Sequence, residues 1–392
     1  MKKYLSIFAA CAVMMVLSLS LVACSDDDDD SSSSSESGEV DIYNLKYSDV
    51  DAASWGNYMR IVASLLQSDS DGLYQYWSSA TSTYGGVSYA DIFKNHNSTY
   101  YASANDCVQE MIAGCADIAN EVGSSKIGEP YYLYVAGQTT AALYAVESWY
   151  SYHSRDDYRN NIYSIRNTFY GSLDGTVNEN SLSAILAEYN PTMNAQVISL
   201  INAAAAAIYA IPQPFRNNID SDEAAEAMDA CGELETYLTQ TVAPYFETIT
   251  DEDVLQPAVE QFVDAVVLPT YEELAELNAA LYTAVLAFQQ SPSDDAFATC
   301  AEAWLEAREP WEKSEAFLWG PVADKGLDPN MDSWPLDQAQ IYNVLTSGDY
   351  SELEWDGDYD EEDDDIAAAQ SVRGYHTLEY LIFMDGEART VE

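Results

Sequence analysis

The chain has 392 residues, 48% of them hydrophobic, which is long enough for two domains that each bury a core. Its 66 acidic residues face 15 basic ones, so the formal net charge is -51. Because nucleic-acid binding needs clustered Lys and Arg, this balance excludes it as a main role. Such acidity is typical of a protein that stays soluble outside the cell, and it also concentrates cations near the surface.

The N-terminus is typical of a lipoprotein signal sequence. A basic start and an apolar run lead into the letters LVAC, which end at Cys24, a residue that can be acylated. We expect residues 1–23 to be removed and lipid on Cys24 to anchor the protein to a membrane. Residues 24–40, rich in Asp and Ser, form a tether that cannot pack. No later apolar run is expected to span a bilayer.

The Asp run after Cys24 resembles the surface-export signal of bacterial surface lipoproteins. This resemblance implies an outer-membrane lipoprotein exposed at the cell surface. A position facing the periplasm is the alternative.

Four cysteines remain in the part expected to fold, namely Cys107, Cys115, Cys231 and Cys300. Cys107 and Cys115 lie on one helical pattern about 12 Å apart, so they cannot bond to each other without breaking that helix. Small or apolar neighbours favour buried structural thiols over metal ligands. The sequence leaves the disulfide state of all four open.

Beyond the tether, apolar residues recur at three- and four-residue steps, whereas alternation with period two is rare. The sequence therefore predicts an all-α protein. Pro269 should divide one long candidate helix, since proline interrupts a helix interior. The expected helices cover residues 47–67, 100–122, 130–153, 156–170, 191–211, 221–246, 253–291, 294–318 and 364–384.

The block from 147 to 171 carries four polar candidates for a ligand-binding cleft, Glu147, Ser151, Asp157 and Asn161. Glu147 and Ser151 are four residues apart and so share a helical face. A surface position explains each of these residues equally well. A site between domains follows only if both halves of the chain supply groups.

On the helix expected at 294–318, Trp304, Arg308, Trp311 and Glu315 fall on one face. The tryptophans are best explained as core residues. Arg308 either forms a buried ion pair with neighbouring acids or positions a carboxylate or an anionic ligand with its fork of donors.

Near the C-terminus, His376 and Glu379 stand one helical turn apart, just after Gly374. Imidazole and carboxylate are competent ligands for zinc, iron or copper, but two groups do not complete a site. Zinc peptidases of the HExxH or HxxEH type need a second histidine, whereas positions 377 and 380 are Thr377 and Tyr380. The residues thus favour metal binding over catalysis.

The letters GYHTLE from Gly374 to Glu379 resemble the G-x-H-x-x-E motif of the imelysin-like family. Further likeness surrounds the positions Arg308, Trp311, Glu315, Phe317, Gly320, Pro321, Ser333, Trp334, Pro335 and Asp337. The resemblance implies two four-helix bundles side by side, with a cleft between them that contains the glutamate at position 315. It also implies an iron-related role.

The order of the halves differs from the usual family order. The segment 254–281 looks like the family's usual start, and the block 147–171 precedes the His376 motif instead of following it. We therefore predict a circular permutation, with one helical domain at 41–250 and the motif-bearing domain at 251–392. Such a permutation is tolerated when the original termini lie close together.

The resulting hypothesis is an exported lipoprotein that binds a metal ion, iron or an iron complex, and assists iron uptake with a transporter as partner. The predicted metal ligands are His376, Glu379 and Glu315. Two alternatives stay open, a metallopeptidase and an acidic surface scaffold for another ligand.

Overall fold

The computed structural model describes residues 40–96, 99–355 and 357–392, of which residues 41–392 form one compact unit. Helices dominate this part of the chain, and its short strands Phe383–Met384 (β1) and Glu387–Ala388 (β2) pair antiparallel. The predicted all-α class is therefore confirmed. The predicted signal sequence and Cys24 lie outside the described residues.

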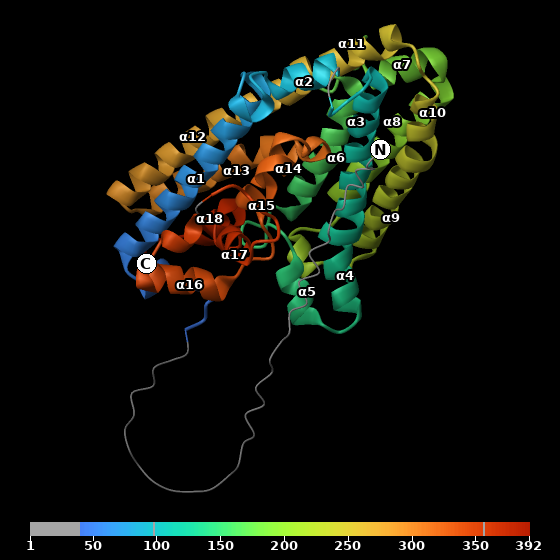
Figure 1. Cartoon of the computed structure of the whole chain (residues 1–392). Helices are drawn as coiled ribbons and strands as arrows, with labels where there is room; N and C mark the ends of the chain where they lie inside the picture. Colours follow the sequence, from blue (N-terminus) through green and yellow to red (C-terminus); the bar gives the residue numbers. More distant parts are fainter. Residues whose placement is uncertain (1–39, 97–98, 356) are drawn as a thin grey trace, which may run out of the picture. The chain divides into compact units, whose positions relative to one another are not determined.

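Two groups of four helices pack as bundles that lie side by side (Figure 1), as predicted. The first bundle consists of α3 (Ala104–Glu121), α6 (Ser154–Tyr170), α8 (Pro191–Ala210) and α9 (Asp222–Tyr237). The second bundle consists of α1 (Ala52–Ser78), α12 (Leu268–Gln290), α13 (Asp294–Glu312) and α18 (Gly374–Ile382). Helices α6 and α13 contact each other where the bundles meet.

Shorter elements connect and cover the bundles. They are η1 (Tyr47–Asp49), η2 (Ser82–Tyr84), α2 (Tyr89–Asn95), η3 (Val122–Lys126), α4 (Gly128–Val135), α5 (Thr139–Ala145), α7 (Leu182–Tyr189), η4 (Phe215–Asn217), η5 (Leu238–Val242), α10 (Ala243–Glu247), α11 (Glu252–Phe262), η6 (Val263–Val267), η7 (Glu315–Phe317), α14 (Pro321–Lys325), α15 (Leu327–Asp332), α16 (Gln338–Ser347), η8 (Ser351–Leu353) and α17 (Asp364–Gln370). Segments η3, η5 and η6 are π-helical, and the other η segments are single 3-10 turns.

The bundles do not follow the order of the sequence. Helix α1 packs against α12 and α18, although its residues belong to the predicted 41–250 domain. Its apolar face, with Trp55, Met59, Val62 and Leu66 at three- and four-residue steps, is buried there. The domain division near residue 250, and the permutation inferred with it, stay predictions.

The longer helices begin at side-chain caps that the sequence supplies. Asp51, Ser103, Ser221 and Ser293 each accept a hydrogen bond from a backbone N–H group in the first turn of α1, α3, α9 and α13. Such a cap satisfies one of the four free N–H groups at a helix start, which contributes about 1 kcal/mol.

The helix expected at 130–153 is divided into α4, α5 and an irregular segment. Gly137 has φ +82° and turns the chain between α4 and α5, a conformation that glycine adopts without steric cost. Ser148 and Tyr152 also have positive φ values, 51° and 62°, so the chain before α6 is a tight loop. This loop, residues 146–153, lies at the candidate site.

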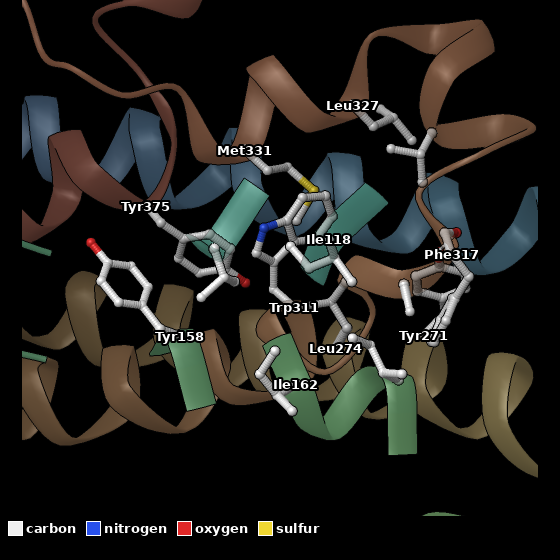
Figure 2. Packing of buried hydrophobic residues seen from close by; sticks show 14 of the residues in the cluster. Ile118, Tyr158, Ile162, Tyr271, Leu274, Trp311, Phe317, Leu327, Met331 and Tyr375 are labelled. Carbon is white, nitrogen blue, oxygen red and sulfur yellow. Dashed lines mark hydrogen bonds between the residues drawn. The ribbon is translucent and has the colours of Figure 1, made fainter. Parts of the chain in front are cut away.

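The two bundles share one hydrophobic core. Figure 2 shows Trp311 of α13 among Ile118 and Ile162 of the first bundle and Met331 and Tyr375 on the other side. All five side chains are buried. Because interiors are packed as densely as organic crystals, this contact fixes α13 and α18 relative to α6 and so positions the polar groups described below.

The four cysteines of the described part are buried and free, as the prediction of structural thiols requires. Helix α8 is the one described helix long and apolar enough to span a membrane by length and composition, whereas none was expected. Its large apolar side chains, including Val197, Leu200 and Ile208, are buried where it packs against α6 and α9. This is the arrangement of a bundle helix.

Candidate functional site

His376 lies on α18 at the point where the helix begins. Gly374 precedes it with φ +87°, and a Cβ atom there would come within 2.6 Å of the Met331 carbonyl oxygen, so α18 can approach α15 closely only because this residue is glycine. The imidazole is fully buried. Its Nδ1 lies 3.0 Å from Glu379 Oε2, and its Nε2 lies 3.1 Å from Asp332 Oδ1.

Burial and the nearby Arg308 would lower the pKa of His376, but its hydrogen bonds to Asp332, Glu147 and Glu379 raise that pKa well above the usual value. The ring is therefore an imidazolium that donates from both nitrogens. A metal ion could bind Nε2 only by displacing this proton.

Glu379 is held by the loop that precedes α6. Its Oε1 accepts hydrogen bonds from the backbone N–H groups of Tyr150 (3.0 Å) and Ser151 (2.8 Å) and from the Ser151 hydroxyl (2.7 Å). Its Oε2 faces His376, so both oxygens have protein partners. Glu379 thus orients the imidazole, in the way that second-shell carboxylates orient metal-binding histidines.

Arg308, on α13, lies at the centre of the site and is fully buried. Its guanidinium Nη2 lies 2.6 Å from Glu147 Oε1 and 2.5 Å from Glu312 Oε1, and its Nη1 pairs with Asp332. Burial lowers the pKa of Arg308, but Asp332, Glu312, Asp157 and Glu147 together raise it well above the usual value. The arginine is the internal counter-ion of this group.

Asp332 ends α15 and links the bundles. It accepts a hydrogen bond from Trp311 Nε1 at 2.7 Å in addition to its contacts with Arg308 and His376. Burial would raise the pKa of Asp332, but Arg308 and His376 hold it well below its usual range. It is therefore an ionised carboxylate in a buried position.

From the first bundle, α6 contributes Asp157 and Asn161, both fully buried. Asp157 accepts a 2.5 Å hydrogen bond from the Ser148 hydroxyl and lies 2.7 Å from His153 Nδ1. Burial lowers the pKa of His153, but Asp157 raises it to about 9. Asn161 donates to Glu312 Oε2 at 2.5 Å.

A second set of charges surrounds Lys126, which lies in η3. Its Nζ is 3.2 Å from Glu147 Oε2, 3.4 Å from Glu315 Oε1 and 3.9 Å from Glu121 Oε1. Burial would lower the pKa of Lys126, but Glu147 and Glu315 raise it well above the usual value. Burial raises the pKa of Glu315 well above the usual value despite the lysine.

Two groups of side chains have ligand atoms close enough to share one cation. Glu147, Asp332 and His376 form one, and Glu312, Glu315 and Asp332 form the other, with the ligand atoms of each within 4.8 Å of one another. Glu312 Oε1 is buried and lies 2.5 Å from Arg308 Nη2, so another cation could bind this oxygen only by displacing the guanidinium. Oxygen and imidazole donors of this kind suit iron, manganese or zinc.

The structure brings most of the predicted site residues into this network. His376 and Glu315 each belong to one three-residue group, whereas Glu379 belongs to neither and contacts His376. Glu147, Ser151, Asp157, Asn161 and Arg308 all lie in the network, while Gly374 acts through the backbone.

Sequence reasoning missed Lys126, Asp332, Glu312, Glu121 and Asp328. Glu312 lies four residues after Arg308, a spacing that indicates an ion pair on one helix face. Only the fold shows that Asp332, at the end of α15, faces His376.

Comparison with known proteins supports a family assignment. A family model described as Imelysin matches residues 28–241 and 267–392. The crystal structure of an imelysin peptidase from Bacteroides ovatus is 54% identical and superposes with a TM-score of 0.87, covering 90% of this chain and 100% of that one.

Iron-regulated protein A from Synechococcus elongatus is 27% identical over 166 residues. This match covers 41% of the chain and 36% of the relative, so the chain spans little more than a third of that protein. The two matched segments of the family model together cover most of the chain, including His376, Arg308 and the loop before α6. The chain belongs to the imelysin family.

Proposed function

We propose that the chain binds a metal ion, with iron as the first candidate, at the group formed by Glu147, Asp332 and His376. The observation that carries the proposal is the convergence of these three ligand atoms from three separate elements within 4.8 Å. An imidazole and two carboxylates are a donor set that binds divalent first-row metals. The match to iron-regulated protein A supports iron as the cargo.

The charge balance of the buried network also favours a cation. Its buried acidic side chains are Glu147, Asp157, Glu312, Glu315, Asp332 and Glu379, and the part-exposed Glu121 and Asp328 interact with them. Its cationic side chains are Lys126, His153, Arg308 and His376. Acids outnumber cations, so some of the buried carboxyl groups must hold protons or gain another positive charge.

Two acidic groups of the network have raised pKa values. Burial raises the pKa of Glu312 to about 8 and that of Asp328 to about 7, against only partial compensation from Arg308 and Lys126. A metal ion that enters the network replaces such protons and releases them, which makes its affinity increase with pH.

Arg308 must move for the metal to bind at this group. Its Nη2 lies 3.3 Å from His376 Nε2 and 2.6 Å from Glu147 Oε1, which are two of the ligand atoms. Metal and guanidinium therefore compete for Glu147 Oε1 and for the space beside His376 Nε2. The arginine stabilises the metal-free fold and weakens binding, which suits a protein that must release its cargo.

We further propose that the protein is held at the cell surface by lipid on Cys24 and passes the metal, or a metal complex, to an uptake transporter. The LVAC sequence before the Asp run supports the lipid anchor. Metabolic labelling with a palmitate analogue tests it, and Cys24→Ala should abolish the label.

Titration calorimetry, together with metal analysis after gel filtration, tests the metal site with Fe(II), Fe(III), Zn(II), Cu(II) and Mn(II). We expect one bound ion in the wild type and a loss of about tenfold or more in affinity for His376→Ala and Asp332→Asn. His96→Ala is the matched control because His96 follows α2 and contacts Gln256 outside the network. Equal binding by the wild type and both site variants would refute the proposal, as would the absence of any binding.

Peptide hydrolysis is the second candidate because the related Bacteroides ovatus structure is named a peptidase. The site supports it less well, since Glu379 has both oxygens engaged by protein donors and is not placed as a general base. Chelator-sensitive cleavage of a peptide library, lost in Glu379→Gln, would favour this candidate over cargo binding.

A further inference from the structure

The α4–α5 hairpin has an unusual composition for this acidic chain. From Pro130 to Val146 there is no Asp, Glu, Lys or Arg, although charged residues make up 21% of the sequence. The uncharged stretch ends at Glu129 on one side and at Glu147 of the buried network on the other. Its large side chains are tyrosine, leucine and valine.

The large apolar side chains of this hairpin are exposed. Tyr132 is 62% exposed, Val135 64% and Tyr134 36%, whereas single exposed apolar residues are normal on protein surfaces. The chain turns at Gly137, and the residues from Val135 to Ala141 are all exposed. The tip therefore presents no charged side chain to water. Clustered exposure of this kind marks an interaction surface.

The uncharged helix α8 is a useful comparison. It also lacks charged residues, but most of its large side chains face the bundle, and Tyr209 is the large side chain exposed on its outer face. The hairpin differs in that Tyr132, Tyr134 and Val135 are all exposed within four consecutive residues.

The hairpin lies beside the start of the folded chain. Tyr144 of α5 stacks on Tyr43, with ring centroids 4.3 Å apart, and also contacts Trp149. In Figure 1 the turn between α4 and α5 lies at the periphery of the helices. About 20 residues separate Tyr43 from Cys24, and a chain of that length reaches at most about 65 Å.

We propose that the tip of the α4–α5 hairpin, centred on Tyr132, Tyr134 and Val135, contacts the interfacial region of an uncharged lipid bilayer. Tyrosine favours this region because its ring is apolar and its hydroxyl stays hydrated. The inference rests on the proposed lipid anchor for bringing the hairpin near a membrane, while the contact itself must be detectable at millimolar lipid without the anchor.

Charge explains why the contact uses this part of the surface. With a net charge of -51, most of the fold is repelled by anionic headgroups. The uncharged hairpin can approach a bilayer without that penalty. Contact there would hold the domain in one orientation relative to the membrane.

Flotation of residues 41–392 with phosphatidylcholine vesicles tests the proposal without any lipid anchor, and this part of the chain forms one compact unit with its own core. The double variant Tyr132→Ser with Val135→Ser should reduce the vesicle-bound fraction about fivefold or more. The double variant Tyr189→Ser with Tyr209→Ser is the control because these tyrosines are 53% and 52% exposed on α7 and α8. The control should float like the wild type, and added anionic lipid should reduce flotation.

Three results would overturn the proposal. They are no flotation of the wild type at millimolar lipid, equal loss in both double variants, or stronger binding to anionic than to uncharged vesicles. Unchanged thermal unfolding of both variants ensures that the comparison reports on the surface. Because the flotation assay needs neither Cys24 nor metal, its failure is distinguishable from failure of the lipid anchor or of the metal site. If the hairpin instead binds another protein, the wild type will not float.

Discussion

Replacing Arg308 with methionine tests whether the network depends on its internal cation. Methionine fills much of the volume of the arginine stem but supplies no charge. The change leaves Glu147, Glu312 and Asp332 without the guanidinium that now lies within hydrogen-bonding reach of each.

Breaking a buried ion pair by removing one partner costs about 3–5 kcal/mol, because the remaining charge is desolvated and uncompensated. Arg308 is 0% exposed, so solvent cannot screen the loss. Protonation of one carboxylate recovers part of this cost, and we expect a net loss of about 4 kcal/mol at neutral pH. For a protein of this size such a loss corresponds to a decrease in Tm of about 5 °C.

Thermal unfolding followed by circular dichroism, in buffer treated with chelator, measures the effect. Arg60→Met is the control because Arg60 forms no ion pair with any described residue. The destabilisation should shrink as the pH falls, since the orphaned carboxylates then become neutral. Added Fe(II) or Zn(II) should raise the Tm of Arg308→Met more than that of the wild type, because the metal takes the place of the guanidinium.

A Tm for Arg308→Met within about 2 °C of the wild type would show that the network does not need this cation. If the variant is destabilised but gains nothing from metal, the network is a structural ion cluster and the metal-binding proposal fails at this group.

Two further predictions concern stability. Gly374→Ala should cost about 2–4 kcal/mol, because its φ is +87° and the added Cβ meets the Met331 carbonyl oxygen at 2.6 Å. Gly232→Ala, on α9 with open space around it, should be neutral or slightly stabilising in the same urea titration; equal losses would contradict the steric argument. Glu312→Gln should alter how the free energy of unfolding depends on pH. In the wild type the folded-state pKa of Glu312 is about 8, above the usual 4.5, so the folded protein loses stability as the pH rises from about 4.5 through 8. The variant should lack this decline, and parallel profiles of Tm against pH would refute the assignment of a proton to Glu312.

Local patterns in the sequence predicted the helices because helix formation depends on near neighbours. The three- and four-residue apolar steps correspond to observed helices. The expected helix at 130–153 was too long because Gly137 was not read as a turn, and the positive φ of Ser148 has no local sequence signal. That loop depends instead on its contacts with α18.

Contacts between distant segments could not be predicted in the same way. His376 and Arg308 were identified from a short motif and from helical spacing, but their shared partner Asp332 lies on another short helix. Lys126, which pairs with Glu147 and Glu315, stands in a π-helical segment that no periodicity indicates. Which acid meets which base is decided by how the bundles pack, and single-chain patterns do not contain that information.

The hydrogen bonds from the loop before α6 to Glu379 restrict the movement of α18. Three donors from Tyr150 and Ser151 hold one carboxylate oxygen on α18, while the other oxygen faces the imidazole. Helix α18 therefore cannot rotate or slide past the neighbouring bundle without first breaking these hydrogen bonds. A ligand that drew His376 away from Glu379 would therefore also disturb the hydrogen bonds between α18 and the loop before α6.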